Sequence, residues 1–182
     1  MTKGTWVGVG VFVIAVAALV VLLVLPSPTR APTHEPATFA ECVAAGYPVM
    51  ESYPRQCNTP SGKGFTEDIG NAIEKQDLIR ADSPKPGTAI SSPLTIAGEA
   101  RGTWYFEASF PYELRTASGT VIASGPVQAS GDWMTTDFVP FSISASFPAQ
   151  PSGSSGTLIL KKDNPSGDPA RDDALTIPVV FQ

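Results

Sequence analysis

Histidine and cysteine are nearly absent from this chain of 182 residues, which contains one histidine and two cysteines. The single histidine, His34, excludes a His-based catalytic triad and any metal site built from several histidines. Basic residues are also scarce, with 12 Lys and Arg against 17 Asp and Glu. Phosphate-backbone binding requires clustered Lys and Arg that release counterions, so the net charge of −5 argues against a nucleic-acid partner.

The motifs of common enzymes are missing as well. No Gly-x-Ser-x-Gly or Ser-x-x-Lys sequence occurs, and the part of the chain after His34 contains no histidine to activate a nucleophile. We therefore expect a protein that is not an enzyme, without catalytic residues, cofactor or metal ligands.

A long uncharged run, Trp6–Leu25, reads WVGVGVFVIAVAALVVLLVL. As a helix it would extend about 30 Å, the thickness of a bilayer's hydrocarbon core. A cleaved signal peptide is the alternative, but its apolar region is usually only about 7–15 residues and ends at an Ala-x-Ala-like site. Here a Pro-Ser-Pro sequence follows the run. Within residues 1–25 we therefore expect a cytoplasmic N-terminus, which Lys3 favours, and a single membrane pass that anchors the chain in the lipid bilayer.

Proline dominates residues 26–37, PSPTRAPTHEPA. Proline fixes φ and favours polyproline II, so this segment predicts a semi-rigid stalk of up to about 37 Å. His34 lies within it, far from any second ligand, and is interpreted as an exposed linker residue.

Both cysteines lie in residues 38–70, which have the signals of a small α+β module. Thr38 and Glu41 have the spacing of a capping box, predicting a short helix that ends at Gly46. An extended run near 49–53, a turn at 58–62 and a strand near 64–66 follow. About thirty residues bury too little apolar surface to be secure alone.

A disulfide between Cys42 and Cys57 would compensate for that small core. It would close a loop whose cross-link stabilises the fold by about 3 kcal/mol in the chain-entropy model. Two cysteines in an exported domain are more often partners than free thiols, and neither a metal site nor a Cys-x-x-Cys redox motif is present. We therefore expect this disulfide.

The sequences around the cysteines, ECVAAGYP and PRQCNTPSGKGF, resemble short cysteine modules of bacterial envelope proteins. They are also similar to the end of a Kazal-type inhibitor, in which a loop beside a cysteine inserts into a protease. That second resemblance covers under thirty residues, and the several disulfides of such inhibitors are missing. A protease-inhibitor-like or signalling role of the Cys42–Cys57 loop is therefore the alternative hypothesis.

Residues 78–182, which follow a short linker at 71–77, alternate between apolar runs and turn clusters. The period of two within the runs predicts seven strands and an antiparallel, immunoglobulin-like β-sandwich, with a small barrel as the alternative. The expected strands are Leu78–Ala81, Leu94–Gly98, Trp104–Leu114, Val121–Ser124, Phe138–Phe147, Thr157–Lys161 and Leu175–Phe181.

The longest expected strand, Trp104–Leu114, assigns its residues to two faces. The alternation places Trp104, Phe106, Ala108, Phe110, Tyr112 and Leu114 on the core face. Tyr105, Glu107, Ser109 and Glu113 are then on the solvent face.

The C-terminal region also resembles a known family, the immunoglobulin-like domain associated with bacterial spore germination, over residues 79–181. The resemblance rests on runs such as GTWYFEASFPYEL, GDWMTTDFVPFSISASF and GTLILKKDNPSGDP. Its most informative residues are Gly98, Trp104, Phe106, Glu107, Phe110, Gly131, Asp132, Trp133, Asp163, Asn164, Pro165, Ser166 and Gly167. It implies an extracytoplasmic bacterial β-sandwich, often attached to other envelope modules, and brings no catalytic residue with it.

Two of these motif residues have a structural and a functional interpretation. Glu107 is expected to form an ion pair with Arg101, Arg115 or Lys161, or to cap a turn, rather than to act as a lone catalytic acid. Trp133 is expected to pack at a corner of the core rather than to serve as an exposed stacking platform.

The acidic loop at residues 163–173 carries many side-chain oxygens. Calcium requires six to eight oxygens that converge on one point, and the spacing here is not that of an EF-hand. A polar hairpin loop with Asx turns accounts for the same residues and is the preferred interpretation.

Together these features predict a membrane-anchored bacterial cell-envelope protein with its C-terminal domains outside the cytoplasm. Its expected function is non-catalytic, as a binding or scaffolding module for an envelope protein or the cell wall.

Overall fold

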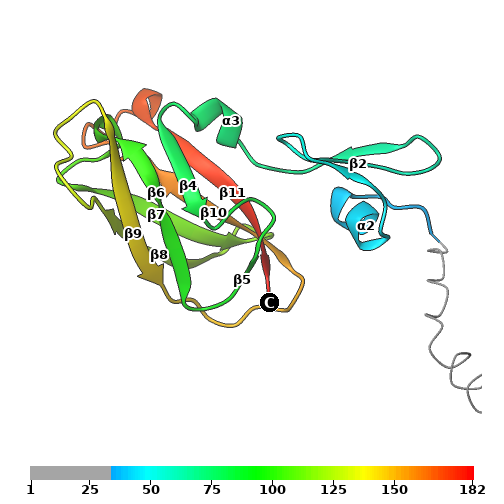
Figure 1. Cartoon of the computed structure of the whole chain (residues 1–182). Coiled ribbons are helices and arrows are strands. Elements are labelled where there is room, and N and C mark those ends of the chain that lie inside the picture. Colours follow the sequence, from blue (N-terminus) through cyan, green and yellow to red (C-terminus); the bar gives the residue numbers. More distant parts are fainter. Residues whose placement is uncertain (1–33) are drawn as a thin grey trace, which may run out of the picture. The chain divides into compact units, whose positions relative to one another are not determined.

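The computed structural model describes residues 34–182, of which Pro36–Gln182 forms one compact unit. Along the chain this unit contains a small module and then a β-sandwich (Figure 1). Among residues 34–182 no helix is long and apolar enough to cross a membrane. The expected anchor, Trp6–Leu25, and most of the proline stalk lie outside the described residues.

The small module begins with helix α2, Phe39–Ala44, whose ends follow the expected signals. Thr38 Oγ1 accepts a hydrogen bond from the backbone N–H of Glu41 at 3.1 Å, and the Glu41 carboxylate accepts one from the N–H of Ala37 at 2.8 Å. Gly46 ends the helix with a φ of +78°, a conformation that glycine adopts without steric cost. The Thr38 half of the predicted capping box is confirmed, whereas Glu41 bonds the residue before the N-cap and not the N-cap itself.

Three short antiparallel strands complete the module in the order β1-β2-β3: Val49–Met50, Gln56–Asn58 and Gly64–Thr66. The predicted disulfide is confirmed, because Cys42 in α2 is bonded to Cys57 in β2. Both cysteines are fully buried, while no large apolar side chain of residues 34–68 is. The disulfide therefore stabilises the module in place of a hydrophobic core.

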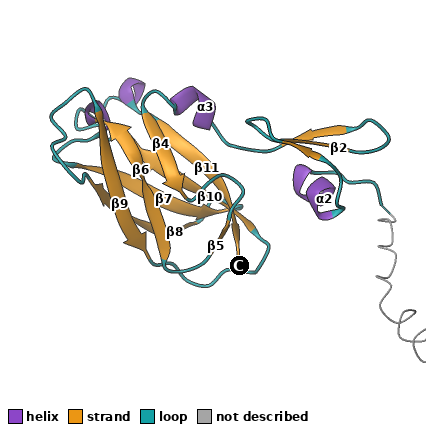
Figure 2. Cartoon of the chain, viewed as in Figure 1, coloured by secondary structure: helices purple, strands orange, loops and turns teal. Residues whose placement is uncertain are grey.

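The sandwich consists of two sheets, as Figure 2 shows. The smaller sheet has the order β4-β6-β9, formed by Ile79–Ser83, Leu94–Arg101 and Phe138–Ala145. The larger sheet has the order β5-β11-β10-β7-β8, formed by Ala89–Ile90, Ala174–Phe181, Ser155–Lys161, Ser109–Thr116 and Val121–Gln128. Pairing is antiparallel except between β5 and β11. The prediction of a mainly β sandwich of two sheets is confirmed for these residues.

The core lies between the sheets and follows the period of two. In β11 every second residue is buried, namely Leu175, Ile177, Val179 and Phe181. Phe110 of β7 meets Phe141 of β9 edge to face with ring centroids 5.2 Å apart, which joins the two sheets by aromatic packing. No disulfide bridges the sheets, so this packing holds them together.

One predicted strand is wrong in its first half. Trp104 belongs to a 3₁₀ turn, η1 (Gly102–Trp104), and β7 starts only at Ser109. The two-residue alternation therefore does not apply before Ser109: Phe106 is 41% exposed and Tyr105 is buried, the reverse of the expected assignment. Strand β5 was not expected, because two residues carry no periodic signal.

The segment expected as a linker, 71–77, contains a short helix, α3 (Ala72–Lys75), held against β11. The Asn71 side-chain amide donates to Ala174 O at 2.9 Å and accepts from the N–H of Thr176 at 2.8 Å and from its hydroxyl at 3.1 Å. Asn71 thus forms hydrogen bonds with the part of the β11 edge that β5 does not pair with. Ile69, just before it, is buried.

Candidate functional site

Three connections between strands meet at one end of the sandwich, and we call this surface the loop end: residues 102–108, 129–137 and 162–173. Backbone hydrogen bonds join them to one another. Gly102 N donates to Asp137 O at 3.1 Å, and Ala129 N donates to Ala108 O at 2.8 Å. Asp163 N donates to Trp104 O at 3.0 Å. The three connections therefore form one continuous surface.

The first connection is fixed by buried aromatic residues. Trp104 is 1% exposed and Tyr105 4%, and the Tyr105 hydroxyl donates to Val139 O at 2.8 Å. Burial raises the pKa of Tyr105 above its ordinary value, so the phenol stays protonated and keeps this bond. Gly102 lies against the second connection, where a Cβ would be only 2.0 Å from Thr135 O. Only glycine allows this approach.

A tight two-residue turn then leads into β7. Phe106 and Ser109 exchange backbone hydrogen bonds at 3.0 and 3.1 Å, and between them Glu107 and Ala108 have φ values of +48° and +60°. Positive φ at both central positions is the pattern of a type I′ hairpin turn, in which Asn-Gly is preferred. Glu-Ala adopts it at a steric cost, and the turn leaves Phe106 exposed.

The second connection is held by an Asx-type bond. Asp132 Oδ1 accepts from Met134 N at 3.0 Å. Trp133 packs partly buried against the core, which confirms the expected corner position, while Met134 is 78% exposed. A hollow of about 380 Å³ is lined by residues 133–136 together with Gly102, Thr103 and Tyr105.

The third connection is organised by side chains that bind its own backbone. Asn164 Nδ2 donates to Asp168 O at 2.8 Å and to Asp172 Oδ1 at 2.7 Å, and Asn164 Oδ1 accepts from Ser166 at 2.6 Å. Asp168 Oδ1 accepts from Ala170 N at 3.0 Å. A second hollow, of about 240 Å³, lies between this loop and Phe106. The loop thus has the expected polar turn bonding, and within residues 34–182 no group of three or more acidic, His or Cys side chains is arranged to hold a metal ion.

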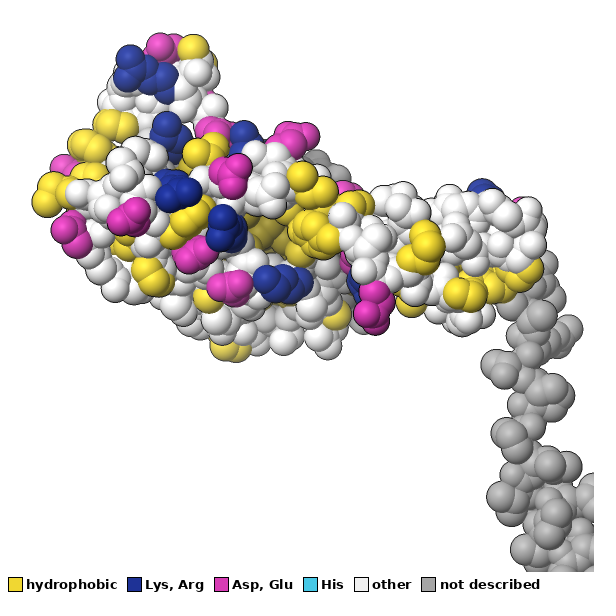
Figure 3. All heavy atoms as spheres, turned by 45° about the horizontal axis from the view of Figure 1, so that its top comes forward, with side chains coloured by type: hydrophobic (Ala, Val, Ile, Leu, Met, Phe, Trp, Pro, Cys, Tyr) yellow, Lys and Arg dark blue, Asp and Glu magenta, His cyan; other side chains and the backbone are white. Residues whose placement is uncertain are grey.

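The loop end gathers most residues that the sequence motifs emphasise. Trp104, Phe106 and Glu107 lie on the first connection, and Gly131, Asp132 and Trp133 on the second. The third connection carries Asp163, Asn164, Pro165, Ser166 and Gly167. Figure 3 shows apolar, acidic and basic side chains close together at the left end of the sandwich.

The remaining motif residues, Gly98 and Phe110, are structural. Gly98 in β6 faces β4, where a Cβ would be 2.1 Å from Arg80 O, and Phe110 is fully buried.

The ion pair expected for Glu107 is not formed. Its carboxylate is exposed, and the expected partners Arg115 and Lys161 both contact Glu113 instead. Arg101 donates to the carbonyls of Asp77 and Thr136 at 3.0 and 3.2 Å. Hydrogen bonding from Lys161 lowers the pKa of Glu113, because it favours the charged carboxylate. Glu113 lies on β7 itself, directly opposite Ile159 of the next strand, so its neighbours are set by register.

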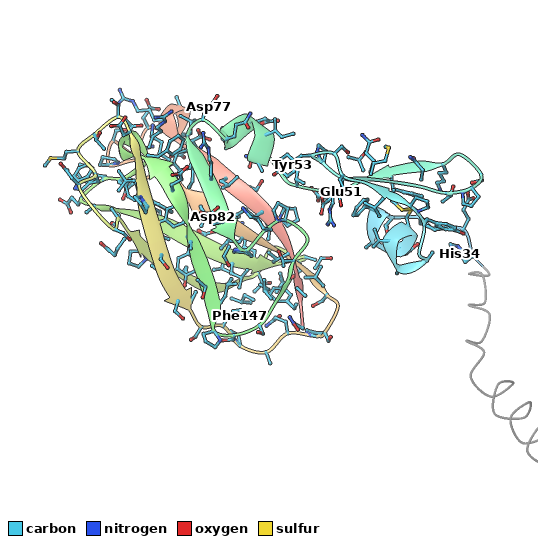
Figure 4. All side chains as sticks on the ribbon, in the orientation of Figure 1. His34, Glu51, Tyr53, Asp77, Asp82 and Phe147 are labelled. Atoms are coloured by element: carbon cyan, nitrogen blue, oxygen red, sulfur yellow. A yellow bond between two sulfur atoms is a disulfide. The ribbon has the colours of Figure 1, made fainter. Side chains whose placement is uncertain are left out.

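The disulfide loop of the small module is a separate exposed feature. Tyr53, in the segment between β1 and β2, is 62% exposed, and Figure 4 shows it with Glu51 on the module. Arg55 forms an ion pair with Glu67 beside β3, and this contact lowers the pKa of Glu67.

Residues 78–168 match the family described as the immunoglobulin-like domain of bacterial spore germination. The match spans half of the chain and includes the two sheets up to the third connection. The chain belongs to this family. Comparisons with curated proteins and with solved structures give no match. The last strand of this immunoglobulin-like domain, β11, lies beyond the matched residues although it sits inside the larger sheet.

Proposed function

We propose that this protein is a membrane-anchored, extracytoplasmic bacterial envelope protein whose immunoglobulin-like domain binds or scaffolds another envelope component, without catalysis. The observation that carries the proposal is the loop end. It combines a rigid, hydrogen-bonded frame with two apolar side chains, Phe106 and Met134, that the fold leaves exposed. Exposed apolar side chains on organised loops are typical of a binding surface.

Family membership supports the same conclusion. An immunoglobulin-like sandwich holds its loops at the two ends of a stable frame, as recognition domains do. Fold alone does not identify a ligand, so the site has to be tested directly.

The test is site-specific photo-cross-linking of the full-length chain in native membranes. A photoreactive phenylalanine analogue replaces Phe106 or Met134, and in the control it replaces Val121, which is 44% exposed on the edge strand β8. We expect the same partner from both loop-end positions and none from Val121. Equal labelling from all three positions would contradict a specific site at the loop end.

Placement outside the cytoplasm has its own measurement. In spheroplasts with intact membranes, an added protease is expected to digest residues 38–182, because the anchor would hold them on the outer side. Protection until the membrane is lysed would overturn the proposed orientation.

The alternative function uses the Cys42–Cys57 loop, and the exposed Tyr53 is the observation that favours it. If this loop inhibits a protease, inhibition should depend on Tyr53 and should survive changes at Phe106 and Met134. Protease assays with Tyr53→Ala and Phe106→Ala chains separate the two functions.

A further inference from the structure

The net negative charge of the chain lies entirely at the loop end. Its three connections contain seven acidic residues and two basic ones, Lys162 and Arg171. The three connections together therefore have a net charge of −5, which equals the net charge of the whole chain. The other residues carry equal numbers of acids and bases. The nearby Arg101 and Lys75 reduce the surplus without cancelling it. The charge is therefore a local property of this surface.

Ion pairing is incomplete at the loop end, as it is elsewhere among residues 34–182. Outside the loop end four acids form an ion pair with arginine or lysine, namely Glu67, Asp82, Glu99 and Glu113. Others, such as Glu51, Glu74 and Asp77, form none. At the loop end two acids are paired, Asp168 with Arg171 at 3.9 Å and Asp173 with Lys75 at 2.6 Å.

Several loop-end carboxylates form no ion pair. Within residues 34–182, the side chains of Glu107, Asp137 and Asp163 form neither a hydrogen bond nor an ion pair. Asp132 is bonded only to the N–H of Met134. These carboxylates do not contribute to the fold through a partner, so they are free to meet positive charge from another molecule.

The exposed apolar side chains lie between these charges. Phe106 directly precedes Glu107 and borders the hollow that Lys162 and Asp163 also line. Met134 borders the other hollow, of about 380 Å³, and is close to Asp132 and Asp137 in the chain. Thr103 and Tyr105 line both hollows, which places the two apolar side chains on either side of one ridge.

We propose that the loop end binds a cationic protein segment that carries large apolar side chains. This inference rests on the proposed binding function and specifies its partner. The uncompensated carboxylates attract lysine or arginine and accelerate encounter, while Phe106, Met134 and the hollows bury the apolar side chains. A partner of net negative charge is repelled by the same surface.

The experiment measures binding of short synthetic peptides to the full-length chain in a mild detergent by calorimetry. The first peptide alternates lysine with leucine. One control replaces each lysine with glutamate, and another replaces each leucine with serine. We expect binding of the first peptide only, with an affinity that falls about tenfold between 20 and 200 mM salt because exposed charges are screened.

Variants locate the site. Asp137→Asn with Asp163→Asn removes two unpaired charges and is expected to weaken binding about tenfold. The matched control, Glu51→Gln with Asp82→Asn, removes two charges outside the loop end, one in the small module and one in β4, and should leave binding unchanged. Phe106→Ser with Met134→Ser should also weaken binding about tenfold, whereas Val121→Ser should not.

Each contrary outcome has a definite meaning. Equal loss in the two charge variants, or equal binding of the glutamate peptide, overturns the cationic partner. Binding of peptidoglycan fragments that requires Phe106 and Met134, without peptide binding, overturns the protein partner but keeps the proposed binding function. If loop-end cross-links also fail to form, both proposals are rejected.

Discussion

The small module and the sandwich are stabilised in different ways. Residues 34–68 bury Pro36, Cys42, Cys57 and Thr59, and their fold is closed by a disulfide. The sandwich buries twenty apolar residues in one cluster and contains no disulfide. The difference follows from size, because the surface buried on folding rises with chain length and a very short segment needs a covalent cross-link.

Binding surface and stability are also separated within the sandwich. The core lies between the sheets, whereas the loop end has few buried residues and holds several unpaired carboxylates. Changes at the loop end should therefore alter binding with little effect on folding, while changes in the core should do the reverse.

The largest effect is expected from Phe110, which is fully buried between the sheets. Phe110→Ala should lower the free energy of unfolding by about 3–5 kcal/mol, since it removes apolar contact and leaves a cavity. Phe106→Ala is the matched control and should cost less than about 1 kcal/mol, because this ring is on the surface. Urea unfolding of both variants measures the difference, and similar losses would contradict the exposed position of Phe106.

The next effect concerns the disulfide. Replacing Cys42 and Cys57 with serine should destabilise the module by about 3 kcal/mol, because the open chain gains conformational entropy. Hydrogen exchange should increase in residues 38–66 and stay unchanged in β6 and β9. If protection were lost equally in both regions, the two would not be stabilised separately.

Asn71 tests where the sandwich begins. Asn71→Ala removes three hydrogen bonds to β11 and should cost about 2 kcal/mol, measured by thermal unfolding. Asn71→Asp retains an acceptor for Thr176 but not the donor to Ala174, so a smaller loss is expected. No loss in either variant would show that residues 71–77 contribute nothing to the sandwich.

The smallest effect is a dependence on pH, with one carboxylate in each region. Hydrogen bonding lowers the pKa of Glu67 beside Arg55 and of Glu113 beside Lys161. A carboxylate whose folded-state pKa is lowered stabilises the protein above its unfolded-state pKa of about 4.3. That contribution, about 1 kcal/mol or less for such partly exposed pairs, is lost as the pH falls through the lower folded-state pKa.

Substitutions assign the two contributions. Glu67→Gln should remove the pH dependence below about pH 4 from the module alone, and Glu113→Gln from the sandwich alone. Hydrogen exchange followed between pH 3 and 6 reads both regions in one experiment. An effect of Glu67→Gln on the sandwich strands would contradict this assignment.

Much of the fold could be predicted from residue patterns. The alternation in 175–181 gives the buried face of β11 correctly, and Thr38, Glu41 and Gly46 give both ends of α2. These signals are local, since each depends on residues within one turn or one strand. The family motifs likewise indicated residues in the three connections of the loop end. They did not indicate that these connections contact one another in the fold.

The failures occurred where contacts between distant residues override the local pattern. Trp104–Ala108 alternates like a strand, but packing of Gly102 against residues 133–135 turns the chain before β7 begins. Asn71 lies in a segment with no strand pattern, and its role depends on β11 more than a hundred residues away. Met134 could have been suspected only as an apolar residue within a polar loop.

Residue order is enough to predict the two-layer β fold, the disulfide and the excess of acidic residues, because each depends on hydrophobic period, cysteine count or charge. Which acids remain unpaired and which apolar side chains stay exposed is set by the folded arrangement. Those properties depend on register and on the meeting of three connections far apart in the chain. The register places Lys161 and Arg115 beside Glu113, whereas Glu107, which follows the exposed Phe106, forms no ion pair.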